Sequence, residues 1–360
     1  MAPGTRPARV RRAQADVRAA IVIAGAGMAG LVAAARAREL GAEPAVFEKG
    51  TRAGGSMLLS SGFAWRYRSW EIFREQCPGG DPVLQGLILK RFDEALDWLE
   101  AQGVKLLTRE TGNPLTVGAR FDPRQLVGTL GRDVRLGETT DEPAILATGG
   151  FPVRLARERG LLLRANPWSE GDGLDHARSR GADTAGDLDE FYGRAMAVVD
   201  DVAEADFVRL GQLYGKFASI TSEDGSEAFT GAPSWSEIDV AQQIGRWPGG
   251  RAWFTVDNAA LAERVRDRTV GEMIEAAREA GAPVEKQEDR VRVLVRAGVT
   301  QTLGGIRVDE RARVLDEQGE PVGGLFAAGA DAGGISTGGW SSGLATALVL
   351  GLVAAESALS

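Results

Sequence analysis

The stretch IVIAGAGMAGLVAAARARELGAEPAVFE, residues 21–48, decides the fold of this 360-residue chain. Its pattern predicts an apolar strand, then a helix, then a second strand. Between the first strand and the helix, Gly25 permits a tight turn, Gly27 lets the backbone approach a pyrophosphate, and Gly30 lets the helix pack closely. Glu48 ends the second strand, where it can accept hydrogen bonds from ribose hydroxyls. This order indicates a dinucleotide-binding unit, and the motif alone does not separate FAD from NAD.

Further glycine-rich segments lie downstream. KGTRAGGS (residues 49–56) and SSG (60–62) follow Glu48, and a glycine pair there lets the backbone lie against a bound dinucleotide. ILATGG (145–150) and GLFAAGAD (324–331) each read as a buried strand that runs into glycine. GGWSSG (338–343) precedes an apolar, Ala/Leu-rich helix.

Together these segments resemble the fumarate reductase and succinate dehydrogenase flavoproteins, in the soluble branch that includes ketosteroid dehydrogenases and tricarballylate dehydrogenase-like enzymes. The resemblance spans residues 20–358 and is strongest at AGAGMAG, ILATGGF and residues 300–334. It implies an α/β fold: a Rossmann-type, glutathione-reductase-like FAD-binding domain interrupted by an α+β capping domain. It implies one FAD. Membrane-bound members of the family attach FAD through a histidine in the stretch after the ribose-binding acid; residues 49–62 contain no histidine, so we expect non-covalent binding.

The resemblance also implies which residues contact FAD. The N-terminus of the last helix would face the flavin, where the helix dipole stabilises negative charge on the reduced ring. In the family an acid that directly follows the glycine of the 324–331 segment contacts the ribityl chain; this chain has Ala330 there, so the expectation passes to Asp331. The expected contacts are Gly25, Gly27, Met28, Ala29, Gly30, Glu48, Lys49, Gly54, Gly55, Ser56, Ser61, Gly62, Ala147, Thr148, Gly149, Gly329, Ala330, Asp331, Ser342, Gly343, Leu344 and Ala345.

Two positions depart from the family pattern. Fumarate reductases and succinate dehydrogenases carry a histidine just before the TxGG element, where this chain has Gln301, and a proton-donating arginine before the last helix, where it has Trp340. Ketosteroid dehydrogenases have a tyrosine near the latter position. An indole N–H donates one hydrogen bond but transfers no proton at neutral pH. The usual fumarate, succinate and ketosteroid chemistries are therefore disfavoured.

Other side chains must then supply the proton transfer and the substrate contacts. A tyrosine could exchange a proton beside a carbonyl, and an arginine could clamp a carboxylate with two hydrogen bonds. Each candidate tyrosine has a cation two residues later, Arg194 or Lys216, on the same side if the segment is a strand. The catalytic candidates are Tyr192, Tyr214, Arg120, Arg251 and Trp340, with Arg246 as a further clamp.

Composition excludes several classes of function. The net charge of −8 argues against nucleic-acid binding. A single cysteine, Cys77, and a single histidine, His176, leave no disulfide framework and no Cys/His metal site, so we expect no metal. The apolar stretch of the last helix, about twelve residues, is too short to span a bilayer, so we expect no membrane association.

The N-terminus imitates a twin-arginine signal, with Arg11 and Arg12 ahead of the apolar run at Ile21. Cleavage after that run would remove the glycine motif, so we expect a cytoplasmic protein.

We divide the chain into a flexible arm (1–20), two parts of the FAD domain (21–164 and 298–360) and a capping or substrate domain (165–297).

The segment 126–145 is shorter than the resemblance leads us to expect, so few antiparallel strands remain to cover the adenosine.

The predicted function is an FAD-dependent dehydrogenase or reductase of a carbon–carbon bond next to a carbonyl or carboxylate, with hydride passing to or from flavin N5 under a closed cap. A single dinucleotide motif implies a small-molecule substrate and a separate electron acceptor or donor. The alternatives are a degenerate flavin-binding protein without turnover and an NAD(P)-dependent oxidoreductase.

Overall fold

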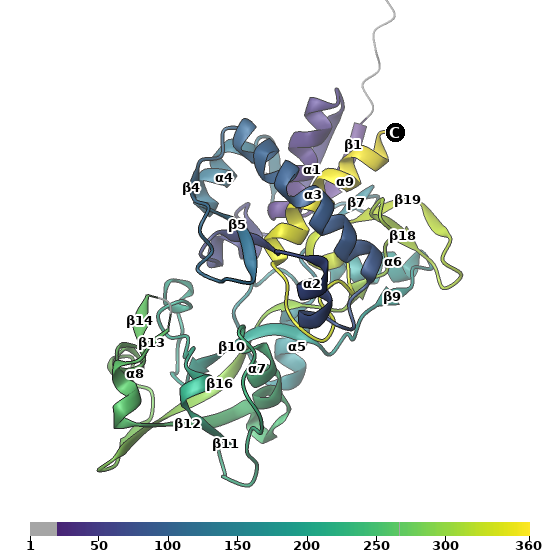
Figure 1. Ribbon diagram of the computed structural model, residues 1–360. Helices are drawn as coiled ribbons and strands as arrows, with labels where there is room; N and C mark the ends of the chain where they lie inside the picture. The colour runs from purple at the N-terminus through teal and green to yellow at the C-terminus, as the bar shows by residue number, and fades with distance from the viewer. Residues whose placement is uncertain (1–19, 266) are drawn as a thin grey trace, which may run out of the picture.

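A six-stranded sheet forms the centre of the larger domain (Figure 1). The structure is a computed structural model that describes residues 20–265 and 267–360, so the expected N-terminal arm falls almost wholly outside the described residues. The strand order is β18-β19-β7-β1-β2-β6, in which all neighbours are parallel except β18 and β19. The strands are β1 (Ala20–Ala24), β2 (Glu43–Glu48), β6 (Val134–Leu136), β7 (Ile145–Leu146), β18 (Arg313–Leu315) and β19 (Pro321–Ala327).

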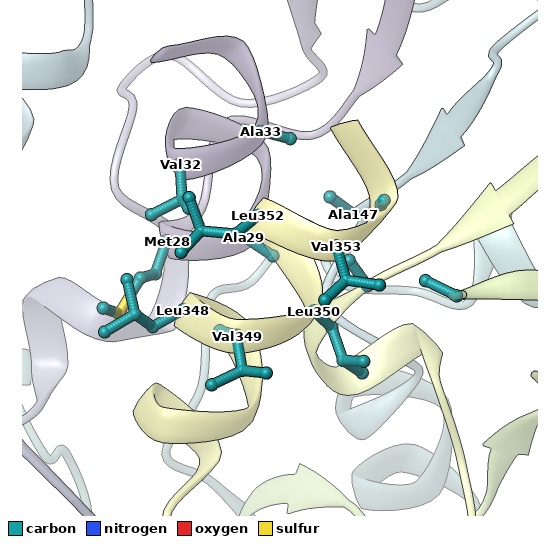
Figure 2. Packing of buried hydrophobic residues seen from close by; sticks show 14 of the residues in the cluster. Met28, Ala29, Val32, Ala33, Ala147, Leu348, Val349, Leu350, Leu352 and Val353 are labelled. Atoms are coloured by element: carbon teal, nitrogen blue, oxygen red, sulfur yellow. The ribbon is translucent and has the colours of Figure 1, made fainter. Parts of the chain in front are cut away.

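Two apolar helices pack against each other over this sheet. They are α1 (Met28–Glu39) and α9 (Gly343–Ala358), and their side chains interlock, with Val32 beside Leu352 in Figure 2. A Cβ atom on Gly351 would lie 2.7 Å from a carbonyl oxygen of α1, so this glycine permits the close approach. α9 is apolar on nearly every side because the protein surrounds it. No helix in the described part of the chain has the length and apolarity needed to cross a membrane.

A smaller sheet with order β3-β5-β4 and three helices complete this domain. Two of the helices begin with Asp followed by Pro, at Asp81 and Asp122; each carboxylate accepts a hydrogen bond from a first-turn N–H and so caps its helix. The elements are β3 (Phe63–Tyr67), β4 (Leu106–Thr108), β5 (Thr116–Phe121), α2 (Trp70–Gln76), α3 (Pro82–Ala101) and α4 (Pro123–Leu130).

The second domain has its own hydrophobic core around a sheet with order β10-β16-β12-β11. The long strand β16 also pairs with β8 and β15 and so connects most of this domain (Figure 1). Its strands are β8 (Leu162–Leu163), β10 (Phe191–Ala197), β11 (Ser219–Ser222), β12 (Arg251–Asp257), β13 (Arg264–Val265), β14 (Arg268–Thr269), β15 (Val284–Lys286) and β16 (Arg290–Thr302). Its helices are α5 (Pro152–Arg159), α7 (Ile238–Arg246) and α8 (Val270–Glu279).

The chain crosses between the two domains more than once. α5 already contributes Leu155 and Ala156 to the second core, upstream of residue 165 where we placed the boundary. The chain then returns through α6 (Asp172–Ser179), which packs in the first core, and β9 (Thr184–Ala185), which pairs with β17 (Gly305–Ile306). The second domain is called the cap below. The chain passes between it and the first domain several times, and these crossings connect the two domains.

The segment 126–145 contains the end of α4 and then β6, a strand at the edge of the central sheet. β6 pairs in parallel with β2, with Leu136 opposite Glu48. The chain then runs alongside the Glu48 loop, where the Gly137 and Glu138 amides donate to the carbonyls of Gly50 and Glu48. The β2 edge of the central sheet is therefore bordered by a single parallel strand and a loop.

Candidate active site

A cavity of about 920 Å³ lies between the two domains, within the volume range typical of small-molecule and cofactor sites. Gly27, Ala147 and Gly329 border it, and these residues follow the carboxyl ends of β1, β7 and β19. In open α/β sheets, ligands bind at this end of the strands. The cap closes the other side with residues such as Tyr192 and Arg194.

The three glycines of the GAGMAG loop have different structural roles. Gly25 has a φ of +100°, and a Cβ atom there would clash with the carbonyl oxygen of Ala147. A Cβ atom on Gly30 would clash with the carbonyl oxygen of Gly25, where the first turn of α1 meets the preceding loop. A Cβ atom on Gly27 would have no neighbour within 4 Å and would project into the space where the loop borders the cavity. The fold requires glycine at the first two positions, and only a bound group would require it at Gly27.

Glu48 connects the loop to the cavity. Its side chain is buried; Oε2 accepts a hydrogen bond from the Ala26 amide at 2.9 Å and Oε1 accepts one from the Gly50 amide at 2.8 Å. Each carboxylate oxygen keeps a second lone pair. Because Glu48 also borders the cavity, it can hold the loop and accept hydroxyl donors at once.

The glycine pair after Glu48 lies directly against this loop. The Gly54 amide donates to the Ala26 carbonyl at 2.8 Å, and a Cβ atom on Gly55 would lie 3.3 Å from the Cα of Gly27. Both glycines have positive φ angles. The two glycine-rich segments therefore form one backbone surface at the cavity wall.

Most of the expected cofactor contacts border the cavity, and some do not. Those at the cavity are Gly27, Met28, Ala29, Glu48, Gly54, Gly55, Ser56, Ser61, Ala147, Thr148, Gly149, Gly329, Ala330, Ser342, Gly343 and Leu344. Those set back from it are Gly25, Gly30, Lys49, Gly62, Asp331 and Ala345. Lys49 forms ion pairs with Glu170 at 2.6 Å and Asp172 at 3.0 Å.

Asp331 is buried behind the cavity wall. Its carboxylate accepts hydrogen bonds from the Thr148 amide, the Thr148 hydroxyl at 3.0 Å and the Gly150 amide at 2.9 Å. Burial raises the pKa of the Asp331 carboxyl. These bonds join the end of β19 to the end of β7, so Asp331 shapes the wall, while Gly329 and Ala330 beside it face the cavity.

The N-terminus of α9 also points at the cavity. Ser342 caps the helix, with its hydroxyl accepting from the Ala345 amide at 3.3 Å. Gly343 follows, and the side chain of Gln301 lies so close that a Cβ atom on Gly343 would clash with its amide oxygen. Gln301 thus occupies the wall beside the free N–H groups of the helix.

Tyr192 and Trp340 form a parallel stack at the cavity wall, with ring centroids 3.7 Å apart and an interplanar angle of 10°. Tyr192 comes from β10 of the cap and Trp340 from the loop before α9, so the stack joins the two domains. The Arg194 guanidinium lies over the Tyr192 ring, 4.9 Å from its centroid. The strand spacing therefore brings Arg194 to the same side as Tyr192, as the sequence predicts.

The other catalytic candidates are distributed differently. Tyr214 is fully buried in the cap core, its hydroxyl has no hydrogen-bond partner among the described residues, and burial raises its pKa. Arg251 lies off the cavity, 3.4 Å from Glu223, and Arg246 does not border the cavity either. Arg120 does border it, with Nε donating to the Ser61 carbonyl at 3.0 Å.

Several cavity residues are absent from the sequence-based set. Phe63, Trp65 and Tyr67 of β3 all border the cavity, and their alternation in FAWRY is a strand signal that could have revealed a shared aromatic face. The Tyr67 hydroxyl donates to the Trp340 carbonyl at 2.6 Å. Asn166 also borders the cavity, and no local motif marks it.

Comparisons with known proteins agree with this architecture. A family model described as an FAD binding domain matches residues 20–143 and 131–344. A fumarate reductase (cytochrome) from Shewanella frigidimarina is 23% identical over 413 residues, covering 88% of this chain and 72% of that protein.

Two solved structures share the fold. The open conformation of a flavocytochrome c3 fumarate reductase has a TM-score of 0.67 and 21% identity, covering 96% of this chain and 78% of that one. 3-Ketosteroid-Δ4-(5α)-dehydrogenase from Rhodococcus jostii RHA1 has a TM-score of 0.67 and 20% identity, covering 96% and 97%. The expected α/β fold class is confirmed.

Proposed function

The chain belongs to the FAD binding domain family of FAD-dependent oxidoreductases, and from this premise we propose that it dehydrogenates or reduces a carbon–carbon bond next to a carbonyl or carboxylate. The observation that carries the proposal is the position of Tyr192. Its phenol, a group able to exchange a proton, stands at the wall of the cofactor cavity between Trp340 and Arg194.

The residues of the glycine-rich wall fit FAD. The open space at Gly27 and the N-terminus of α1 suit a pyrophosphate, and Glu48 has lone pairs for ribose hydroxyls. The N-terminus of α9 adds a positive dipole end at Gly343, which favours negative charge nearby. When bound, FAD supplies the acceptor or donor of hydride. No histidine lies in residues 49–62, so the attachment is non-covalent.

Breaking or forming a C–H bond beside a carbonyl also requires the transfer of one proton. Tyr192 supplies or takes this proton at its hydroxyl oxygen, while Trp340 holds the phenol ring by stacking. The positive charge of Arg194 stabilises negative charge on the phenol oxygen or on a substrate oxygen. Gln301, the cross-strand neighbour of Tyr192, can donate or accept a hydrogen bond beside Gly343.

A screen under anaerobic conditions tests the proposal. FAD-loaded protein is mixed with saturated and unsaturated carboxylates, enones and steroids, and the visible absorbance of the flavin is followed. Bleaching by a saturated compound, or reoxidation of dithionite-reduced protein by its unsaturated partner, supports carbon–carbon chemistry. If no saturated compound bleaches the oxidised flavin and no unsaturated compound speeds reoxidation of the reduced flavin, the alternative of a flavin-binding protein without turnover replaces this function.

The electron partner is a separate molecule in this proposal. The chain has one dinucleotide motif, at residues 25–30, and the cavity takes FAD there. A nicotinamide cofactor would need a second such site, and the family match gives the NAD(P)-dependent alternative no support. Electrons therefore enter or leave through a carrier or a diffusible acceptor.

A further inference from the structure

Two neighbouring arginine side chains of the cap, one of which borders the cavity, have no acidic partner among the described residues. Arg194 is 8% exposed and borders the cavity. Of its five N–H donors, one group donates to the Ser236 carbonyl. Within residues 20–265 and 267–360, no carboxylate lies within 4 Å of the guanidinium of Arg194 or of Arg164.

Arg164 lies behind Arg194 and is also charged. Its Nη1 donates to the Thr300 hydroxyl at 2.9 Å and its Nη2 to the Phe207 carbonyl at 3.2 Å, while the buried Nε has no partner among the described residues. Burial lowers the pKa of Arg164 to about 10, and repulsion from Arg194 acts in the same direction. The side chain still carries its proton at neutral pH, so the wall holds two positive charges close together.

The sheet itself brings these two arginines together. β16 runs between β8 and β10, and its Gly298 lies opposite Arg194 on one side and Leu162 on the other. A Cβ atom on Gly298 would lie 2.9 Å from the Cδ of Arg164. The glycine therefore leaves room for the Arg164 side chain to cross the sheet toward Arg194.

A buried charge without a counter-ion is costly, because the lost hydration is not replaced. The cost falls when an anion enters the cavity and meets the free donors of Arg194. Arg120 and Arg268 also border the cavity, and each donates to backbone carbonyls. Arg194 is the most buried of the three, so it offers the strongest position for an anionic group.

The surroundings of this position are apolar. Val208, which is 58% exposed, and Leu213 border the same cavity. Trp235, which is 48% exposed, also borders it and directly precedes Ser236, the acceptor for Arg194. Large exposed apolar side chains at a cavity rim favour a ligand with an apolar body.

We propose that the substrate is a monocarboxylate with an extended apolar body, whose carboxylate binds Arg194 and whose body lies against Val208, Leu213 and Trp235. This inference rests on the proposed function and names its substrate class. It separates this protein's substrate from a dicarboxylate, whose second charge would lie against the apolar side chains, and from a neutral ketone, which would leave the Arg194 charge uncompensated.

Binding without turnover tests the proposal. Isothermal titration of FAD-loaded protein compares 3-phenylpropanoate with 3-phenylpropan-1-ol, which has the same body and no charge, and with succinate, which has two carboxylates and no apolar body. We expect 3-phenylpropanoate to bind at least about tenfold more tightly than either, the usual effect of a charge-assisted hydrogen bond. Equal binding of acid and alcohol, or tighter binding of succinate or of 4-androstene-3,17-dione, would overturn the proposal.

Variants then locate the site. Arg194→Gln should weaken 3-phenylpropanoate binding about tenfold or more and leave the affinity for 3-phenylpropan-1-ol unchanged. Arg292→Gln is the matched control, because Arg292 lies on the same cap sheet, pairs with Glu285 at 2.7 Å and does not border the cavity. Undiminished acid binding in Arg194→Gln refutes the site. If that variant loses FAD, the acid–alcohol comparison in the unmodified protein decides alone.

The outcome separates this inference from the proposed function. Tight, charge-dependent binding of 3-phenylpropanoate with no redox reaction for any carboxylate would retain the anion site and reject the oxidoreductase reaction. Flavin reduction or reoxidation by neutral enones alone, without carboxylate binding, would retain the reaction and reject the anion site.

Discussion

The phenol of Tyr192 lies flat on the indole of Trp340, with ring centroids 3.7 Å apart, although the two residues are 148 positions apart in the chain. From the family resemblance we expect a proton-handling side chain at the position of Trp340, and an indole cannot transfer a proton. The stack places a phenol immediately beside that position. In the proposed mechanism the cap, through this phenol, supplies the group that transfers the proton.

Tyr192→Phe is expected to slow substrate-driven flavin reduction about a hundredfold, because it removes the hydroxyl and keeps the stacking ring. FAD content should not change. The measurement is anaerobic stopped-flow absorbance with the substrate found in the screen. Tyr214→Phe is the matched control: its hydroxyl is buried and unpartnered among the described residues, so its loss should leave the rate unchanged. A wild-type rate in Tyr192→Phe would remove this residue from the mechanism.

Glu48→Ala is expected to weaken FAD binding by about 1.5–3 kcal/mol, roughly ten- to a hundredfold in Kd, since a charged acceptor for the ribose hydroxyls is lost. Glu48→Gln should weaken it less, because the amide oxygen can still accept one of the two backbone hydrogen bonds. Flavin fluorescence during titration of deflavinated protein gives both constants. Equal affinity of Glu48→Ala and the unmodified protein would mean that the ribose binds elsewhere.

Gly27→Ala should weaken FAD binding, whereas Gly30→Ala should destabilise the fold. The added methyl group at Gly27 enters open space, so the thermal midpoint of deflavinated protein should be unchanged while FAD binding falls about tenfold or more. At Gly30 the methyl group clashes with the Gly25 carbonyl, so unfolding should occur at lower temperature even without FAD. Thermal unfolding with and without FAD distinguishes the two. A destabilised Gly27→Ala without FAD would contradict the open space at that residue.

Acid or heat should release all of the flavin as free FAD. The reason is the lack of histidine in residues 49–62, the stretch in which the family resemblance implies that a covalent attachment would lie. Denatured protein is removed by centrifugation, and the supernatant is analysed by chromatography. Yellow colour that stays with the pellet would show a covalent bond.

The βαβ unit could be predicted from residues 21–48 because its determinants are local. Gly25 and Gly30 fit their positions through contacts within one turn and its neighbouring strand, and the helix and strands follow from short apolar patterns. Asp331 shows the limit of such reasoning. The sequence places it one residue after a cavity residue, and the chain turns it inward to hold Thr148 and Gly150.

By itself, the sequence determined the dinucleotide-binding unit, the glycine-rich segments that meet at its edge and the family resemblance that names FAD. It treated Tyr192 and Tyr214 alike, since each is followed by a cation after two residues. Only the tertiary structure decided between them, because the pairing of β10 with β16 turns one phenol to the cavity while the cap core surrounds the other. The same pairing brings Arg164 and Arg194 together. Such contacts depend on the register between strands that are far apart in the chain, and no local sequence pattern encodes that register.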